Sequence, residues 1–131
     1  MQKSIVIGDM NANPFDSEMV NKDAFNAVLF KKVIDERSST VYSGDAYERF
    51  YNPMLNCIKE ENESYGTFYY SSGIGPLYWN CYDQILVRKA LMNNIEEIKF
   101  LKKIKGEKLL NKTKPNDKIS DHLPLFVKIN L

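Results

Sequence analysis

The chain has 131 residues, of which 44% are hydrophobic, so it is long enough for one core and too short for two ordinary domains. Its 18 lysines and arginines nearly balance its 17 aspartates and glutamates, which excludes a global field able to hold nucleic acid or an anionic membrane. Any recognition of phosphate must therefore be local.

The two cysteines and the hydropathy pattern limit the classes of protein to which the chain can belong. Cys57 and Cys81 lie far apart, in no metal-binding or redox spacing, which favours two buried free thiols over a disulfide or a zinc site. No apolar run approaches the length of a membrane-spanning helix. We therefore expect no membrane span, and a soluble, cytoplasmic protein is favoured.

The N-terminal part of the chain predicts a strand followed by a long helix. Residues 4–7 form a short apolar run with β-branched side chains that ends at Gly8, and they predict a buried strand. A helix is expected from Asp16 or Ser17 to about Arg37. Its apolar stripe, which we interpret as core rather than as a docking site, consists of Val20, Phe25, Val28, Leu29 and Val33.

The middle of the chain predicts a loop, a helix and two strands. Residues 38–45 are polar and contain glycine, which indicates a loop, and residues 47–59 suggest a helical stretch that Pro53 interrupts. Residues 66–70 and 78–87 are aromatic and β-prone, with glycines and a proline between them. We expect these last two segments to pair as strands.

The C-terminal part predicts a loop and a closing strand. Residues 95–104 fit both a helix face and the alternation of a strand. Residues 111–118 form a charged loop with proline and asparagine, and residues 125–129 predict the last strand.

The first motif that can carry chemistry is Gly8-Asp9-Met10-Asn11. Asp9 and Asn11 leave the first strand as alternate residues, so they can present a carboxylate and an amide to one pocket. The carboxylate can orient or deprotonate a water, and the amide can donate to a phosphoryl oxygen. The same residues could merely make a satisfied turn. The segment that begins at Asp9 is not an EF-hand calcium loop, because Pro14 occupies the required glycine position and Val20 occupies the position of the bidentate glutamate.

The second and third motifs are Asp83, in the run Tyr82-Asp83-Gln84-Ile85-Leu86-Val87, and the pair Asp121-His122. A charged group within an apolar strand is costly unless it has a partner. Arg88 or Lys89 could pair with Asp83, but Asp121-His122 supplies a second carboxylate and the only imidazole of the chain. A lone histidine is more often structural than catalytic. Here Asp83 can fix the imidazole tautomer and support its charge against a phosphate.

The full third motif is Ser120-Asp121-His122-Leu123-Pro124. The three motifs, in this order, resemble the C-terminal half of the endonuclease/exonuclease/phosphatase superfamily. The resemblance covers essentially the whole chain. The resemblance implies an α+β fold: half of a four-layer α/β-sandwich, a mostly antiparallel sheet with helices on one face. It favours a strand for the first half of residues 95–104. Residues 1–131 would form one C-terminal half domain, with the N-terminal half absent.

The resemblance also implies roles for the motif residues. Asp9 would handle the attacking water and Asn11 would contact the scissile phosphate. His122 would lie on the phosphate and be held by Asp83. Asp121, together with Asp9, would bind a divalent metal, Mg²⁺ or Mn²⁺. Relatives take a metal-binding glutamate from their first half, so we expect weak metal binding here and slow or no hydrolysis by the isolated chain.

Two functions therefore stay open. One is a divalent-metal-dependent phosphoesterase, a nuclease-like hydrolase of phosphodiester or phosphomonoester bonds. The alternative is a catalytically inactive truncated fragment that folds and self-associates, since a lone half would expose a sheet face and could form a homodimer through it. The motifs contact phosphate and metal, which nucleic acids, inositol phosphates and phospholipids share, so they do not name the phosphate-ester substrate.

One further feature is a run of lysines before the last motif. We interpret it as a solvated surface first and as a phosphate-steering patch second. Its members are Lys102, Lys103, Lys105, Lys108, Lys112 and Lys114.

Overall fold

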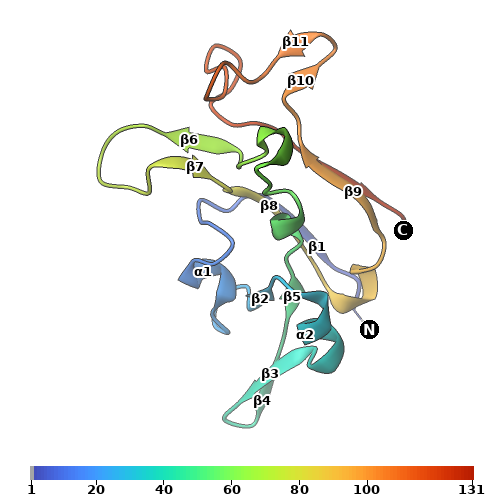
Figure 1. Ribbon diagram of the computed structural model, residues 1–131. Helices are drawn as coiled ribbons and strands as arrows, with labels where there is room; N and C mark the ends of the chain where they lie inside the picture. The colour runs from blue at the N-terminus through green and yellow to red at the C-terminus, as the bar shows by residue number, and fades with distance from the viewer. Residues whose placement is uncertain (1) are drawn as a thin grey trace.

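Residues 2–131 are described by a computed structural model, in which strands predominate and helices are few and short (Figure 1). This composition belongs to the α+β or mainly-β class. The strands are β1 (Ile5–Asp9), β2 (Ala27–Val28), β3 (Ser39–Tyr42), β4 (Asp45–Glu48), β5 (Phe50–Tyr51), β6 (Phe68–Tyr70), β7 (Tyr78–Asn80), β8 (Asp83–Val87), β9 (Ile95–Phe100), β10 (Lys103–Ile104), β11 (Glu107–Lys108) and β12 (Leu125–Ile129). The helices are α1 (Ser17–Val20) and α2 (Lys31–Glu36), with single 3₁₀ turns η1 (Met54–Asn56), η2 (Glu61–Glu63) and η3 (Lys89–Leu91).

The central sheet has the strand order β1-β8-β5-β2. Strands β1 and β8 pair antiparallel along their whole length, with Asp9 opposite Asp83. Strand β5 pairs antiparallel with β8, and β2 pairs parallel with β5. A separate antiparallel ribbon, β9–β12, lies beside this sheet, and the hairpins β3–β4, β6–β7 and β10–β11 extend from the body of the molecule (Figure 1).

Strand β8 is the centre of the core because its successive side chains enter two different hydrophobic clusters. Ile85 and Val87, 2% and 0% exposed, pack in a cluster that the β9–β12 ribbon covers. Leu86, 0% exposed, points to the other face and packs with Met19 of α1. Ile34 of α2 belongs to the first cluster. A strand buried on both faces is held in register strongly, since a one-residue slip would exchange its two faces.

This arrangement corrects two expectations about the sheet. The helices do not cover one face, because α1 contributes to one cluster and α2 to the other. The sheet face that we expected to be bare is covered over β8 by the β9–β12 ribbon. Apolar side chains are instead exposed at the sheet edge, where Ile5 and Ile7 of β1 are 38% and 55% exposed. The predicted strand at residues 4–7 is therefore present, but it is an edge strand and not a buried one.

The long helix expected between residues 16 and 37 is wrong. The chain folds there as α1, β2 and α2, with a turn in which the carbonyl of Asn21 accepts hydrogen bonds from the amides of Ala24 and Asn26. Asn26 has a φ of 49°, and the Nδ2 of its buried side chain donates to the carbonyl of Tyr47. Pairing of β2 with β5 outweighs the helical periodicity, so Val20 and Val33 are exposed at 36% and 37% and are not core.

The loop expected at residues 38–45 and the helix expected at 47–59 are also mostly wrong. Residues 39–48 form the β3–β4 hairpin, whose two-residue turn has positive φ at both Ser43 and Gly44. Two central residues with positive φ make the type I′ turn that suits the twist of a hairpin. The later segment contains β5 and only one 3₁₀ turn, η1, after Pro53.

The second half of the chain follows the sequence closely. Residues 66–70 and 78–87 contain β6, β7 and β8, and β6 pairs with β7 as expected. Strand β9 resolves the ambiguous segment, residues 111–118 lie between strands, and β12 closes the chain. Cys57 and Cys81 are free and buried, as predicted. None of the helices within residues 2–131 has the length and hydropathy to cross a membrane.

Candidate active site

The candidate site begins where β1 ends and β8 starts. Antiparallel pairing sets Asp9 directly opposite Asp83, so two carboxylates emerge on the same face of neighbouring strands. The ladder continues for one more bond, from the amide of Met10 to the carbonyl of Tyr82. Like charges placed opposite each other are unfavourable unless a donor lies between them.

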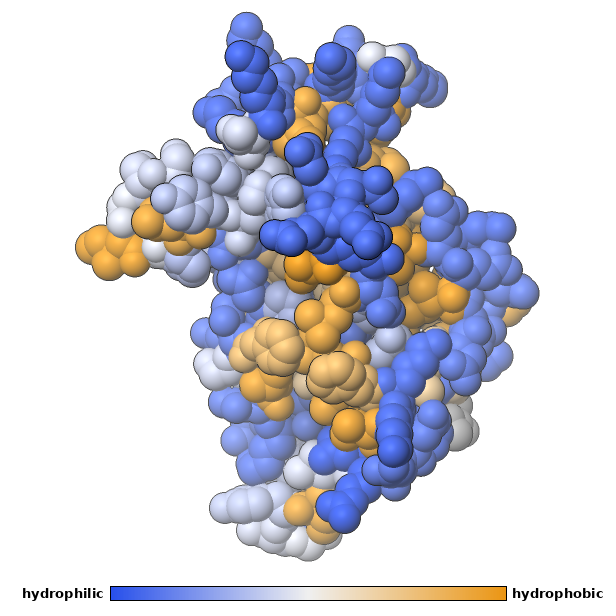
Figure 2. Space-filling model, viewed as in Figure 1, coloured by the Kyte–Doolittle hydropathy of each residue, from blue (hydrophilic) through white to orange (hydrophobic). Residues whose placement is uncertain are grey.

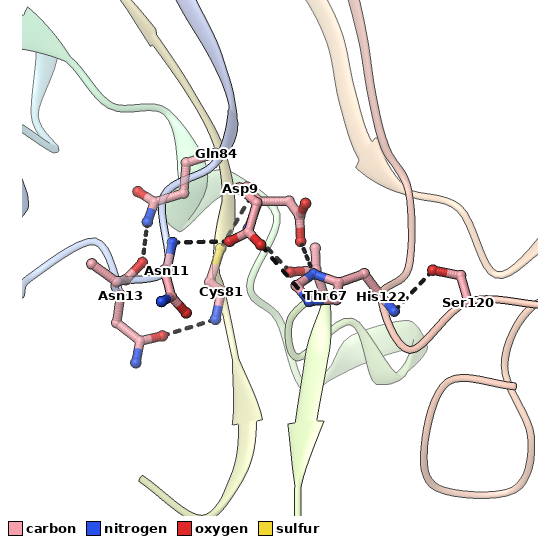
Figure 3. Close-up of polar contacts among 10 residues, drawn as sticks. Asp9, Asn11, Asn13, Thr67, Cys81, Gln84, Ser120 and His122 are labelled. Atoms are coloured by element: carbon pink, nitrogen blue, oxygen red, sulfur yellow. Dashed lines mark hydrogen bonds and ion pairs between the residues drawn. The ribbon is translucent and has the colours of Figure 1, made fainter. Parts of the chain in front are cut away.

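His122 reaches this place through a short strand-like contact with the β6 segment. The amide of Leu123 donates to the carbonyl of Thr67 at 2.7 Å, and His122 forms an isolated antiparallel bridge with Phe68. Thr67 is fully buried, and its hydroxyl accepts from the amide of Asp83 at 3.2 Å. Thr67 therefore ties the segment that carries His122 to the strand that carries Asp83, and Figure 3 shows Thr67 next to His122.

The imidazole of His122 has one ring nitrogen near each of the two carboxylates, those of Asp83 and Asp9, and Figure 3 shows it beside Asp9. Its Nδ1 is 2.6 Å from Asp83 Oδ2, which is a hydrogen bond, and its Nε2 is 4.0 Å from Asp9 Oδ2, which is too long for one. The expected contact between Asp83 and His122 is confirmed. The side chains of Asp83 and His122 are 21% and 23% exposed and that of Asp9 is 51% exposed, so the site opens to solvent on the Asp9 side.

Aromatic rings form the wall behind the imidazole. The ring centroid of Phe68 lies 4.9 Å from that of His122, and Phe68 stacks on Tyr82 at 5.5 Å. Such rings exclude water from one side of the Asp83–His122 bond, which strengthens it.

Asn11 lies beside Asp9 and fixes one of its oxygens. The amide nitrogen of Asn11 donates to Asp9 Oδ1 at 2.9 Å, and Asn11 has a φ of 51°. This is the local turn that the sequence left as an alternative, and it is present. It occupies Oδ1 and leaves Oδ2 on the side of His122, while the exposed amide group of Asn11 stays outside the turn.

Asn13 is a positioning residue that the sequence did not indicate. Its Oδ1 accepts from the amide of Cys81 and its Nδ2 donates to Asn80 Oδ1, both at 2.8 Å. The amide of Asn13 in turn donates to Asp16 Oδ2 at 2.8 Å. Asn13 thus joins the loop that follows Asp9 to the break between β7 and β8.

Gln84 holds the same loop from the opposite face of β8. This side chain is fully buried, donates to the carbonyl of Ala12 at 2.5 Å and accepts from Asn52 Nδ2 at 2.8 Å. Asn52, also fully buried, accepts from the amide of Met54. Buried amides that are this fully satisfied specify a single arrangement. The available signal was a glutamine within an apolar strand, next to Asp83.

Asp121 does not join the cluster. It is exposed, and it makes no ion pair within residues 2–131. In that part of the chain no group of three or more histidine, cysteine, aspartate or glutamate side chains lies close enough to hold a metal ion. Mg²⁺ demands near-octahedral oxygen ligands, so the side chains present do not by themselves make a site for it. Metal binding at Asp9 and Asp121 remains a prediction from the sequence.

The neighbouring thiols of Cys57 and Cys81 are protonated, and therefore uncharged, at neutral pH. Burial, followed by the charges of Cys57 and Asp83, raises the pKa of Cys81 to about 12. Burial raises the pKa of Cys57 to about 11, against a smaller opposite effect of Lys59. A buried thiol of this kind is inert, because the thiolate is the nucleophile and the metal ligand. Cys81 therefore supports the site by packing and not by chemistry.

No protein-family model, no curated protein and no solved structure matches this chain. The site defined by the fold is an aspartate-supported imidazole with a second carboxylate, open to solvent at the edge of a sheet.

Proposed function

We propose that this chain is a phosphoesterase whose reacting groups are His122, Asp83 and Asp9. The single observation that carries the proposal is the 2.6 Å bond between His122 Nδ1 and Asp83 Oδ2, with Nε2 turned toward Asp9. This arrangement is a nitrogen base oriented by a carboxylate, a recurring element of hydrolytic sites.

The hydrogen-bond partner of His122 decides which of its two ring nitrogens carries the proton. An ionised carboxylate only accepts hydrogen bonds, so Nδ1 carries the proton that Asp83 receives. Nε2 is then free to take a proton from a water, or, once protonated, to donate to a phosphoryl oxygen. Asp9 Oδ2 lies 4.0 Å away on the open side, where it can orient the same water. The exposed amide of Asn11 is the nearby neutral donor for a phosphate oxygen.

A divalent ion would supply charge neutralisation of the phosphate and a more acidic water. The side chains within residues 2–131 do not assemble a site for it, so no step here depends on it. The second candidate is the catalytically inactive alternative, a chain that folds and self-associates without hydrolysing phosphate esters.

Hydrolysis of bis(p-nitrophenyl) phosphate and of p-nitrophenyl phosphate separates the two candidates. The chain is assayed with Mg²⁺, with Mn²⁺ and with a chelator, alongside His122→Ala, Asp83→Asn and Asp9→Asn. If the chain is a phosphoesterase, its rate exceeds that of buffer, and His122→Ala lowers the rate by about 100-fold or more. Asp23→Asn is the matched control, because Asp23 is 75% exposed and its one ion pair within residues 2–131 is with Lys22.

Phosphate binding is measured separately from turnover. His122 is the only histidine of the chain, so its imidazole resonances report on the site without ambiguity. Absence of hydrolysis under any metal condition would favour the inactive alternative, and perturbation of those resonances by inorganic phosphate would show that the site still binds phosphate. Hydrolysis that persists in His122→Ala would refute the roles assigned above.

A further inference from the structure

An aromatic cleft lies between η2, the β6–β7 hairpin and the loop after β11. Four rings line it, those of Tyr65, Tyr69, Tyr78 and Trp79, together with Glu63. The ring centroids of Tyr65 and Tyr69 lie 6.3 Å and 5.5 Å from that of Trp79. The cavity has a volume of about 370 Å³, which is within the range of small-ligand sites. It is separate from the candidate active site, which meets the other face of the same hairpin through Phe68.

The backbone of β7 is bent to bring Tyr78 into this cleft. In the β6–β7 register Tyr78 lies opposite Tyr70, and alternation would place both on the face away from Tyr69. Tyr78 instead has a φ of 72°, and its ring centroid is 5.9 Å from that of Tyr69. A positive φ is strained for an aromatic residue, and such strain is concentrated at ligand sites. The ring is nevertheless 61% exposed, so burial does not account for its position.

A hollow lined by lysines adjoins the cleft. Its volume is about 810 Å³, and it shares Leu110, Lys112 and Thr113 with the cleft. Its basic side chains are Lys102, Lys103, Lys108, Lys112 and Lys114. Figure 2 shows this hydrophilic end of the molecule above the paler arm that carries β6–β7.

The lysines of this hollow carry charge that the chain leaves largely uncompensated. Lys114 pairs with Asp117 at 3.6 Å, and Lys102 donates to the carbonyl of Asn62. Among the described residues no carboxylate pairs with Lys103, Lys108 or Lys112. A group of largely uncompensated cations beside a cluster of tilted and edge-to-face aromatic rings is complementary to a ligand that combines flat bases with phosphates.

We propose that the aromatic cleft and the lysine hollow together bind single-stranded RNA. One base stacks in the cleft against Trp79 and Tyr78, and the following phosphates lie along the lysines from Lys112 onward. Single strands suit the site because only an unpaired base can leave its stack and enter a cleft lined by aromatic side chains. Double helices present no free base face.

Glu63 selects RNA over DNA in this arrangement. A carboxylate in the cleft repels phosphates but accepts hydrogen bonds from ribose hydroxyls. The 2′-hydroxyl is the group by which a protein distinguishes the two nucleic acids at a given position. The site is a binding site in its own right and does not depend on the phosphoesterase activity proposed above.

Trp79 gives a direct readout, because it is the only tryptophan of the chain. A short oligoadenylate RNA is titrated into the whole chain without divalent metal, and the fluorescence of Trp79 is followed at low and at raised salt. Stacking of adenine is expected to quench the fluorescence, and higher salt is expected to weaken the binding. The DNA oligonucleotide of the same length is expected to bind several-fold more weakly.

Three variants test the separate contacts. Tyr78→Asn removes the ring while suiting the positive φ, and should weaken RNA binding by roughly fivefold to a hundredfold. Lys112→Gln should weaken binding and reduce its salt dependence. Glu63→Gly suits the φ of 52° and should remove the preference for RNA over DNA. The matched controls are Tyr42→Asn and Lys32→Gln, at exposed positions outside both cavities, and they should bind as the unmodified chain does.

Several results would overturn the proposal. Absence of quenching, or unchanged binding in Tyr78→Asn and Lys112→Gln, would show that RNA does not bind at the aromatic cleft and the lysine hollow. If the DNA oligonucleotide bound the unmodified chain as tightly as the RNA does, the preference for RNA would be refuted. Adenosine monophosphate binding as tightly as the oligonucleotide would show that a free nucleotide, and not a polynucleotide, is the ligand.

Discussion

At the scale of single residues, the bond between Asp83 and His122 has a consequence that does not require activity. Because Asp83 accepts from Nδ1, the neutral imidazole should exist as the tautomer with its proton on Nδ1. Asp83→Asn replaces a pure acceptor by an amide that can also donate, so the tautomers should mix or exchange. Long-range ¹H–¹⁵N spectra of the single histidine measure the tautomer directly.

The control for this experiment is the exposed Asp23→Asn, which should leave the spectrum of His122 unchanged. Thermal unfolding of Asp83→Asn checks that the variant is folded. If Asp83→Asn retained the tautomer of the unmodified chain, Asp83 would not orient the imidazole.

The two buried thiols give a prediction about alkaline stability. Unfolded cysteines lose their protons near about pH 8.5, whereas burial raises the pKa of Cys57 to about 11 and of Cys81 to about 12 in the folded chain. The folded state therefore binds more protons than the unfolded state above about pH 8.5. The free energy of unfolding should be highest below that pH and should fall as pH rises toward 11, by up to about 1.4 kcal/mol per pH unit for each thiol. Urea unfolding at a series of pH values measures this slope.

Cys57→Ala and Cys81→Ala serve as the controls, compared by slope and not by absolute stability. Each substitution leaves a small cavity and lowers stability at every pH. The slope between about pH 9 and pH 10 should decrease by one thiol's contribution in each variant. A slope identical to that of the unmodified chain would mean that the thiols titrate alike in both states.

At the scale of elements, Gly66 controls how β6 approaches β7. A Cβ at this position would lie 2.6 Å from the carbonyl oxygen of Asn80, which is backbone and accepts from the amide of Thr67. Gly66→Ala should therefore displace Thr67 and both of its contacts, to Asp83 and to Leu123. We expect a loss of about 1–3 kcal/mol of stability and altered His122 resonances, measured by urea unfolding and NMR.

Gly75→Ala is the matched control on the same hairpin. The three atoms nearest to its Cβ would all belong to the ring of Tyr70, the closest at 3.3 Å, and that side chain can move. Its effect on stability should be small and the His122 resonances should not change. A Gly66→Ala chain with unperturbed His122 would show that the hairpin does not position the imidazole.

The elements also show which features of the fold the sequence could predict. Strands β6, β8 and β12 were predicted because aromatic, β-branched and apolar residues fill short runs between turn signals, whereas the residues over β9 fitted both a helix and a strand and only the family resemblance favoured the strand. The helix between residues 16 and 37 was wrong because parallel pairing of β2 with β5 is a non-local contact that periodicity does not reveal. The β3–β4 hairpin was missed although Ser43-Gly44 between alternating residues was a usable signal.

The candidate site was predictable for a different reason. Asp83 is a charged residue in an apolar strand and needs a partner, and His122 is the only imidazole that could serve. The residues that hold the loop after Asp9 were not predictable in the same way. Asn13 and Gln84 act through backbone groups of Cys81 and Ala12, and such partners become visible only when the chain is folded.

At the scale of the whole molecule, the open edge of the central sheet replaces the bare face that the sequence led us to expect. Strand β1 is the terminal strand of the sheet within the described residues, and its Ile5 and Ile7 are 38% and 55% exposed. An exposed, apolar edge strand is a template for pairing with another chain. We therefore retain the prediction of a homodimer and move its interface to β1.

The test of this interface is a single charge on the edge. Ile7→Lys places a lysine where a second β1 would pair, and lysine is a residue that natural edge strands use to prevent such pairing. Light scattering after size-exclusion chromatography at micromolar concentration should give a dimer for the unmodified chain and a monomer for Ile7→Lys. Val41→Lys is the control, because Val41 is 69% exposed on the β3–β4 hairpin away from β1, and it should remain dimeric. A monomeric unmodified chain would contradict the prediction. A dimeric Ile7→Lys variant would show that the interface lies elsewhere, because a buried lysine without a partner is costly at the centre of a strand pair.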